Sequence, residues 1–206
     1  GMGQGPSDPQ GGYRVGILAH QGDFLEHNLA LRRLGVRAKE VRLPQDLDGL
    51  QGLIIPGGES TTIAGLMDHY ELRGPIIRHV QGGMAAWGTC AGMILAAKSL
   101  KEDRPVPLGL MDIMVSRNAF GRQADSFESE IDVEGLEGGS FHAVFIRAPS
   151  VLDVGSGVRV LARLGDGMPV ATQQNRLLCT AFHPELTSDS RLHAYFLNML
   201  ERTSEV

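Results

Sequence analysis

The stretch Met84-Ala85-Ala86-Trp87-Gly88-Thr89-Cys90-Ala91-Gly92-Met93 decides the fold of this 206-residue chain. Residues 84–88 form a short apolar run typical of a buried strand, and the alanine-rich residues 91–99 are typical of a helix. Between them stands Gly-x-Cys-x-Gly, the pattern of a sharp strand-to-helix turn with a nucleophile at its tip. Glycine fits two residues either side of the nucleophile because side chains there would collide.

Strand-like and helix-like segments alternate around this turn. Before it we expect strands over 14–19, 36–43 and 53–55 and helices over 23–34, 60–69 and 74–81. In the first of these helices the large apolar residues fall roughly on one face: Phe24, Leu25, Leu29, Leu31 and Leu34. After Pro105 we expect strands over 108–116, 127–133, 143–146, 158–164, 169–174 and 177–182, then a helix over 191–201. The alternation predicts a three-layer α/β domain with a mostly parallel central sheet.

The bulk composition narrows the function. Apolar content of 42%, charged content of 21% and a formal charge of −5 are ordinary for one globular domain, and we expect neither nucleic acid nor membrane as a partner. Residues 1–12 read as a flexible leader, with Gly1 before Met2 as a cloning remnant, and residues 13–203 as the single folded domain. Two cysteines without an export signal point to reduced thiols in a cytoplasmic protein.

Cys90 is the candidate nucleophile. In the expected turn it stands at a helix N-terminus, where the partial positive charge favours a thiolate and the backbone N–H of Ala91 can face an oxyanion. The alternative is a buried structural cysteine in a glycine-rich turn. Cys179 lies in an apolar run without such a turn and is expected to be a small core residue.

A base and its orienting partner stand in His183-Pro184-Glu185. Proline keeps His183 extended, and in an extended segment residues i and i+2 project to the same side, so Glu185 can hold one ring nitrogen while the other faces Cys90. A locally satisfied turn histidine is the alternative. The remaining histidines are expected to be surface or packing residues: His20, His27, His69, His79, His142 and His193. The His, Cys, Asp and Glu spacings predict no metal site, and we expect no cofactor.

A second glycine turn, Pro56-Gly57-Gly58-Glu59-Ser60, lies between an expected strand and an expected helix. The Gly58 N–H is a candidate second oxyanion donor, and Ser60 a candidate helix N-cap. The alternatives are a phosphate-binding loop, disfavoured because no Lys follows the glycines, and a plain turn.

These motifs, in this order, resemble class I (triad) glutamine amidotransferase domains, which are flavodoxin-like, and within that class the glutaminase subunits of pyridoxal 5′-phosphate synthases. The resemblance runs from about residue 15 to 200. It is carried by residues 21–27, 56–62, 88–92, 117–123, 145–149 and 182–187. It implies the triad Cys90, His183 and Glu185, and glutamine held by Gly58, Glu59, Ser60, Arg117, Ile146 and Arg147. Either arginine taken alone could instead form a surface ion pair. One departure is His20, where an apolar residue is expected.

The resemblance also implies that ammonia passes to a (β/α)8-barrel synthase subunit, without which the glutaminase is poorly active. Three alternatives remain at this stage. One is a class I glutaminase of another pathway, such as histidine biosynthesis. Another is a cysteine peptidase or γ-glutamyl hydrolase with the same turn. The last is a regulatory binding module, which would leave Cys90 without a role.

Overall fold

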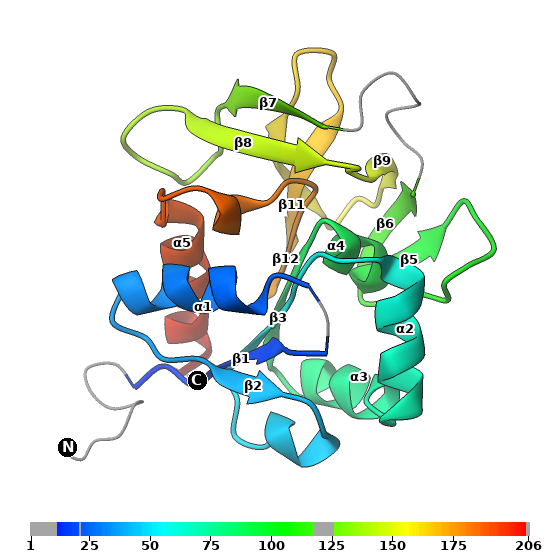
Figure 1. Cartoon of the computed structure of the whole chain (residues 1–206). Coiled ribbons are helices and arrows are strands. Elements are labelled where there is room, and N and C mark those ends of the chain that lie inside the picture. The colour runs from blue at the N-terminus through cyan, green and yellow to red at the C-terminus, as the bar shows by residue number, and fades with distance from the viewer. Residues whose placement is uncertain (1–11, 21, 118–125, 205–206) are drawn as a thin grey trace.

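The computed structural model describes residues 12–20, 22–117 and 126–204, which form a layered α/β structure (Figure 1). A seven-stranded sheet with the order β10-β11-β12-β4-β3-β1-β2 lies at its centre. The strands β1 (Val15–Leu18), β2 (Lys39–Val41), β3 (Gly52–Ile55), β4 (Ala85–Thr89) and β12 (Leu177–Thr180) pair in parallel. At one edge, β10 (Arg159–Arg163) and β11 (Pro169–Gln174) continue the sheet in antiparallel pairing.

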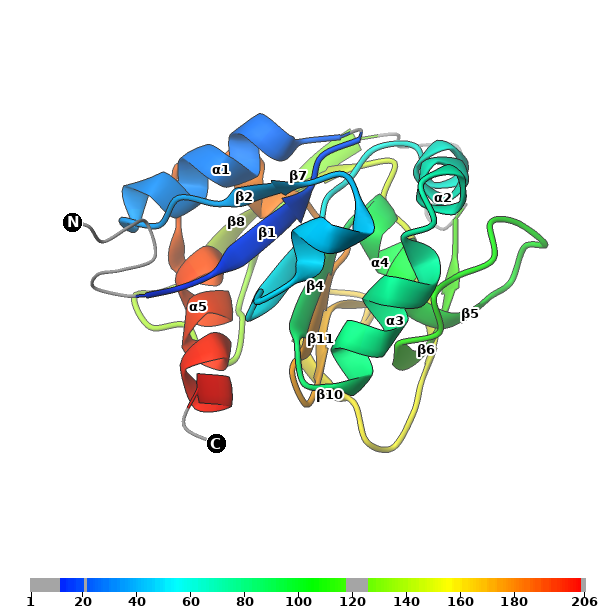
Figure 2. The same cartoon turned by 90° about the horizontal axis from the view of Figure 1, so that it is seen from below.

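Helices cover both faces of this sheet. Figure 2 shows α1 (Phe24–Arg33) and α5 (Arg191–Ser204) on one side, and α2 (Ser60–His69), α3 (Arg73–Gln81) and α4 (Ala91–Ala96) on the other. Two single-turn helices, η1 (Pro44–Leu47) and η2 (Pro184–Leu186), complete the helical elements of the described residues. The predicted three-layer architecture is confirmed. Among the described residues, no helix has the length and apolarity needed to cross a membrane.

Two small sheets adjoin the central one. The first has the order β5-β6-β9, with β5 (Ala97–Leu100), β6 (Met111–Ser116) and β9 (Ser150–Val154). The second is the antiparallel ribbon of β7 (Ser126–Ile131) and β8 (Phe141–Ile146). The ribbon reaches the segment that follows β12, because the His183 N–H donates to the Val144 carbonyl at 2.8 Å.

The core between the sheet and α5 centres on Trp87, which is fully buried in β4. Its indole N–H donates to Oγ1 of Thr180 on the neighbouring strand at 3.1 Å, so the one polar atom of the ring is satisfied. Its ring also lies against Phe196 of α5, with the ring centres 5.5 Å apart. This packing fixes β4 against β12, and therefore fixes the two segments that follow these strands.

Three features of the elements differ from expectation. The helix expected over 91–99 ends at Ala96, and the next residues form β5 because they pair with β6. The strand β9 was not predicted. The buried face of α1 consists of His27, Ala30 and Leu31, whereas Leu25 and Leu29 are exposed. The expected leader (residues 1–11), Gln21 and the stretch 118–125 lie outside the described residues.

Candidate active site

The candidate site lies where four neighbouring parallel strands end. His183 follows β12, Cys90 follows β4 directly, Gly57 follows β3, and Asp23 follows β1. The carboxyl ends of parallel strands meet at one edge of a sheet, so residues far apart in sequence converge there. The fold thereby brings together the predicted nucleophile, base and glycine loop.

The turn at Cys90 has the strained geometry that its sequence predicts. Cys90 has φ 54° and ψ −108°, a conformation that non-glycine residues adopt rarely, and its N–H donates to the Thr180 carbonyl at 2.8 Å. A Cβ added to Gly88 would lie 2.3 Å from the Gly92 carbonyl oxygen, and one added to Gly92 would lie 1.8 Å from that of Ile55. Both glycines are therefore required by close backbone contacts.

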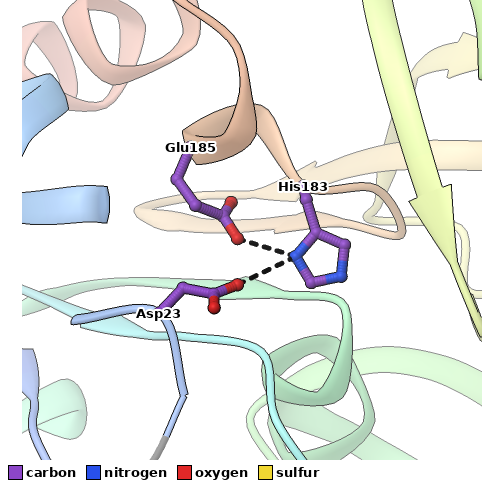
Figure 3. Close-up of side chains that lie close together, drawn as sticks. All are labelled: Asp23, His183 and Glu185. Atoms are coloured by element: carbon purple, nitrogen blue, oxygen red, sulfur yellow. Dashed lines mark hydrogen bonds and ion pairs between the residues drawn. The ribbon is translucent and has the colours of Figure 1, made fainter. Parts of the chain in front are cut away.

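His183 and Glu185 form a buried pair next to Cys90. Nδ1 of His183 lies 2.6 Å from Oε2 of Glu185. Figure 3 draws this contact as a dashed line. Cys90 is next to His183, since a Cβ added to Gly57 would lie within 3.4 Å of both side chains, and its thiol is among the groups that raise the pKa of His183. The Cys90 thiol in turn lies 3.5 Å from the carbonyl oxygen of Ile146, to which it can donate. The fold therefore brings the three residues of the predicted triad to one place, with His183 bonded to Glu185 and next to Cys90.

A fourth group, Asp23, joins this pair. Its Oδ2 lies 3.2 Å from Nδ1 of His183, so two carboxyl groups face the same ring nitrogen (Figure 3). Sequence reasoning missed Asp23, which appeared only inside a stretch of family resemblance. A signal was available, since Asp23 follows the expected first strand and such positions meet at the carboxyl edge of the sheet.

The charges in this cluster depend on one another. Burial alone would lower the pKa of His183, but hydrogen bonds to Asp23, Cys90 and Glu185 outweigh it and raise that pKa. Burial raises the pKa of Glu185 to about 7, while the hydrogen bond to His183 keeps the pKa of Asp23 well below its usual value. The site therefore favours an imidazolium at His183, and Glu185 is the carboxylate that takes up a proton first as the pH falls.

The side chains of Asp23, His183 and Glu185 lie close enough together to have the spacing of a metal site. One ligand atom each from Asp23, His183 and Glu185 lies within 4.8 Å of the others. These atoms are already joined by the hydrogen bonds of the imidazole pair, and Nδ1 of His183 is the nitrogen that the orienting carboxylate needs. The close spacing of the three side chains therefore follows from the two contacts to the imidazole, and it carries no assignment of a metal.

The glycine loop lies against the triad. A Cβ added to Gly57 would lie 2.7 Å from Cε1 of His183 and 3.4 Å from Cβ of Cys90. Gly58 has φ 153°, in the region reserved for glycine. On the other side of the loop, a Cβ on Gly22 would lie 1.8 Å from the Gly57 carbonyl oxygen. The roles of the Gly58 and Ala91 N–H groups as oxyanion donors stay predictions.

The cap of α2 differs from expectation. Glu59, not Ser60, is the N-cap, because its carboxylate accepts from the Thr61 N–H at 3.2 Å and the Thr62 N–H at 2.8 Å. Ser60 is the first helical residue and is buried. The carboxylate of Glu59 is thus engaged at the terminus of α2.

The predicted substrate-binding residues are brought together in part. Nη2 of Arg117 lies 3.5 Å from Oε2 of Glu59, and its Nη1 donates to the Arg104 carbonyl at 3.1 Å. Arg117 therefore forms an ion pair with Glu59, and this pair is compatible with a role of Arg117 in binding substrate. Ile146 reaches Cys90 through its carbonyl, and Arg147 is exposed in a left-handed conformation with φ 49°.

The other cysteine and several histidines have structural surroundings. Burial raises the pKa of Cys179 to about 12, which fits its expected place in the core. Nε2 of His20 lies 2.8 Å from the Arg42 carbonyl oxygen, and its ring stacks on Tyr70 with centres 4.3 Å apart, so this departure from the family pattern is a packing residue here. His27 and His193 are fully buried.

Known proteins resemble this chain in both sequence and fold. The model of the SNO glutamine amidotransferase family matches residues 17–202. The chain is 55% identical to pyridoxal 5′-phosphate synthase subunit PdxT of Thermus thermophilus, over 90% of this chain and 96% of that protein. It is 54% identical to the protein of the same name from Herpetosiphon aurantiacus, over 90% of this chain and 99% of the relative.

Solved structures show the same architecture. A crystal structure of a glutamine amidotransferase superposes with a TM-score of 0.86 at 53% identity, covering 91% of this chain and 98% of the other. A chain of the PurLQS structure from Thermotoga maritima superposes with a TM-score of 0.69 at 16% identity, covering 91% of this chain and 99% of the other. The second likeness concerns the fold alone.

Proposed function

The chain belongs to the SNO glutamine amidotransferase family, and from that premise we propose that Cys90, His183 and Glu185 are the catalytic triad with which it hydrolyses glutamine. The enzyme is a glutaminase, and the ammonia that it releases serves the synthesis of pyridoxal 5′-phosphate. The observation that carries the assignment of residues is the buried pair of His183 and Glu185, 2.6 Å apart, next to Cys90 at a strained strand-to-helix turn.

The first half of the reaction breaks the amide bond. The Cys90 thiolate attacks the δ-carbonyl carbon of glutamine, and the carbonyl π electrons move to oxygen to give a tetrahedral oxyanion. The N–H groups of Gly58 and Ala91 face that oxyanion. The oxyanion then collapses while protonated His183 gives its proton to the leaving nitrogen, which departs as ammonia and leaves a γ-glutamyl thioester on Cys90.

The second half regenerates the thiolate. His183, now neutral, takes a proton from water as the water oxygen attacks the thioester carbon. The new tetrahedral intermediate expels the Cys90 thiolate, and glutamate leaves. Glu185 stays hydrogen-bonded to Nδ1 of His183 throughout, which holds the ring in place and stabilises its charged form.

Glutamine recognition uses the charges at the mouth of the site. Arg117 can bind the α-carboxylate of glutamine through a bidentate fork, and Glu59 can meet its ammonium group. Their 3.5 Å contact in this structure keeps the two charges paired, and the substrate zwitterion would replace each partner by a group of the same sign. We place Gly58, Ser60, Ile146 and Arg147 around the same substrate.

We further propose that the ammonia passes to a separate synthase subunit, a (β/α)8 barrel, and that the two proteins work together in the cytoplasm. Both cysteines are free thiols, as the chemistry of Cys90 requires, and thiols persist in a reducing compartment. The alternatives with a similar turn are a glutaminase of another pathway and a γ-glutamyl hydrolase. The relatives named above favour the pyridoxal 5′-phosphate branch.

The test is ammonia release from glutamine, measured with and without a pyridoxal 5′-phosphate synthase subunit. We expect strong release only with that subunit present, together with pyridoxal 5′-phosphate formation from the phosphorylated sugars. Hydrolysis of γ-glutamyl peptides with no release from glutamine would contradict the proposal.

A further inference from the structure

Glu185 has a polar neighbour on the side away from His183. Nε2 of His27 lies 3.4 Å from Oε1 of Glu185 and 3.4 Å from Oγ1 of Thr89, and the side chains of His27 and Glu185 are fully buried. Within the described residues, Oε1 makes no full hydrogen bond, so this longer contact with His27 is the one that can hold it. Nδ1 of His27 in turn lies 2.9 Å from Nε2 of the buried His193.

Burial favours the neutral form of both histidines. Burial holds the pKa of His27 well below its usual range, with the neighbouring His193 adding to the effect, and burial lowers the pKa of His193 to about 3. A neutral imidazole has one donor nitrogen and one acceptor nitrogen. The row of Glu185, His27 and His193 can therefore take only two arrangements of its protons. The Thr89 hydroxyl, which is hydrogen-bonded to Nε2 of His27, fits either arrangement because it can accept or donate.

The unpartnered atom at the end of the row favours one arrangement. A carboxylate only accepts, so contact with Oε1 requires the proton of His27 on Nε2, and its Nδ1 then accepts from the Nε2–H of His193. This leaves Nδ1 of His193 as a bare lone pair, and that atom has no hydrogen-bond partner among the described residues. The reverse arrangement would bury an N–H without an acceptor, which native structures avoid more strictly.

We propose that His27 is a positioning residue for the triad: it donates from Nε2 to Oε1 of Glu185, and His193 keeps it in the tautomer that can donate. With Oε1 held in this way, Oε2 stays directed at Nδ1 of His183. The donation also favours the ionised carboxylate, which the imidazolium needs. This inference deepens the proposed function and rests on the assignment of Glu185 to the triad.

Other charged groups face the same row and enter the interpretation of any pH effect. Glu185 is faced by His183 and by Asp23, which precedes α1. His27 is faced by Asp23, His183 and His193, and His193 is influenced by Arg33 of α1. The ring of Trp87 lies edge-on to both buried histidines, with centres 5.8 Å and 4.7 Å away, so a variant must preserve packing there.

The test compares His27→Leu, which removes the donor, with His27→Gln, which keeps an N–H at the same reach. Leu31→Val, on the same buried face of α1, is the packing control. With the synthase subunit present, we expect His27→Leu to lower kcat about tenfold with little change in KM. We also expect the acid limb of kcat/KM to move up by about half a pH unit. His27→Gln should recover most of the lost kcat and most of the shift in the acid limb. Leu31→Val should leave the acid limb of kcat/KM where it is in the wild type.

A second readout does not depend on glutamine turnover. The pH profile of Cys90 alkylation by iodoacetamide reports on the His183–Glu185 pair directly, so it tests His27 even if glutamine were not the substrate. We expect the alkylation profile of His27→Leu to shift to higher pH, as the acid limb of kcat/KM does. If that variant does not fold, His193→Phe removes the donor to His27 and should give a smaller shift. Unshifted profiles in these variants, or equal losses in His27→Gln and His27→Leu, would overturn the proposal.

Discussion

Oδ2 of Asp23 lies 3.2 Å from Nδ1 of His183, so the base of the triad faces two carboxylates. Glu185 is the nearer of the two at 2.6 Å, and it belongs to the same short segment as His183. Asp23 comes from the opposite end of the chain and has the lowered pKa of a carboxylate that accepts from a charged ring. Glu185 is more deeply buried than Asp23, and we expect it to contribute more to orienting the imidazole of His183.

The two carboxylates should be partly redundant. We expect Asp23→Asn to lower kcat about threefold and Glu185→Gln about a hundredfold, because removing the main orienting acceptor weakens a triad strongly. The double variant should lose more than the product of the two, since each carboxylate can cover for the other. Steady-state kinetics with the synthase subunit checks this, and a loss equal to or below the product would show that Asp23 does not share the role.

The buried carboxyl of Glu185 should impose a pH limit near neutrality. Its pKa is raised to about 7 by burial, above the ordinary 4.5, so it becomes protonated as the pH falls through that value. A protonated Glu185 no longer stabilises the imidazolium, and kcat/KM should therefore decline below about pH 7. The profile of Glu185→Gln should lack this limb. A wild-type profile that stays flat down to about pH 5.5 would be inconsistent with this assignment.

Gly57 should tolerate no side chain. A Cβ there would lie 2.7 Å from Cε1 of His183, so Gly57→Ala must displace the imidazole and should lower kcat about a hundredfold. Gly65 of α2 is the matched control, because nothing lies within 4 Å of a Cβ added to it. Gly65→Ala should keep activity and raise the melting temperature slightly. Equal activities of the two alanine variants would refute the close contact.

Arg117 should act on substrate binding more than on chemistry. Lysine keeps the charge but not the fork, so we expect Arg117→Lys to raise KM for glutamine about tenfold with kcat nearly unchanged. Arg163→Lys, whose guanidinium contacts the Gly167 carbonyl on the surface, is the control. An unchanged KM in Arg117→Lys would assign Arg117 to its ion pair with Glu59 alone.

The strands and helices up to the turn at Cys90, and the pair of His183 and Glu185, were predictable from local sequence. Glycine spacing marks the turn at Cys90, and the proline after His183 fixes an extended segment. These signals depend on residues close together in the sequence, so they can be recognised without knowledge of the tertiary structure. The same holds for β1, β3 and β4, which are short apolar runs.

Contacts between distant segments were not predictable in the same way. Residues 97–100 continue an alanine-rich run, yet they form β5 because β6 offers them a partner. Asp23 and His27 look like ordinary polar residues of an amphipathic helix, and the apolar pattern placed Leu25 and Leu29 in the core instead. Only the approach of η2 and α5 to α1 gives Asp23 and His27 their buried partners.

The most direct test of the account is ammonia release by Cys90→Ser from glutamine in the presence of the synthase subunit. We expect release to fall by about a thousandfold or more, since a serine lacks the thiolate that starts the reaction. Pyridoxal 5′-phosphate formation from added ammonium salt should continue in the same mixture, which shows that the synthase is intact. Ammonia release at the wild-type rate from Cys90→Ser would contradict the assignment of Cys90 as the nucleophile.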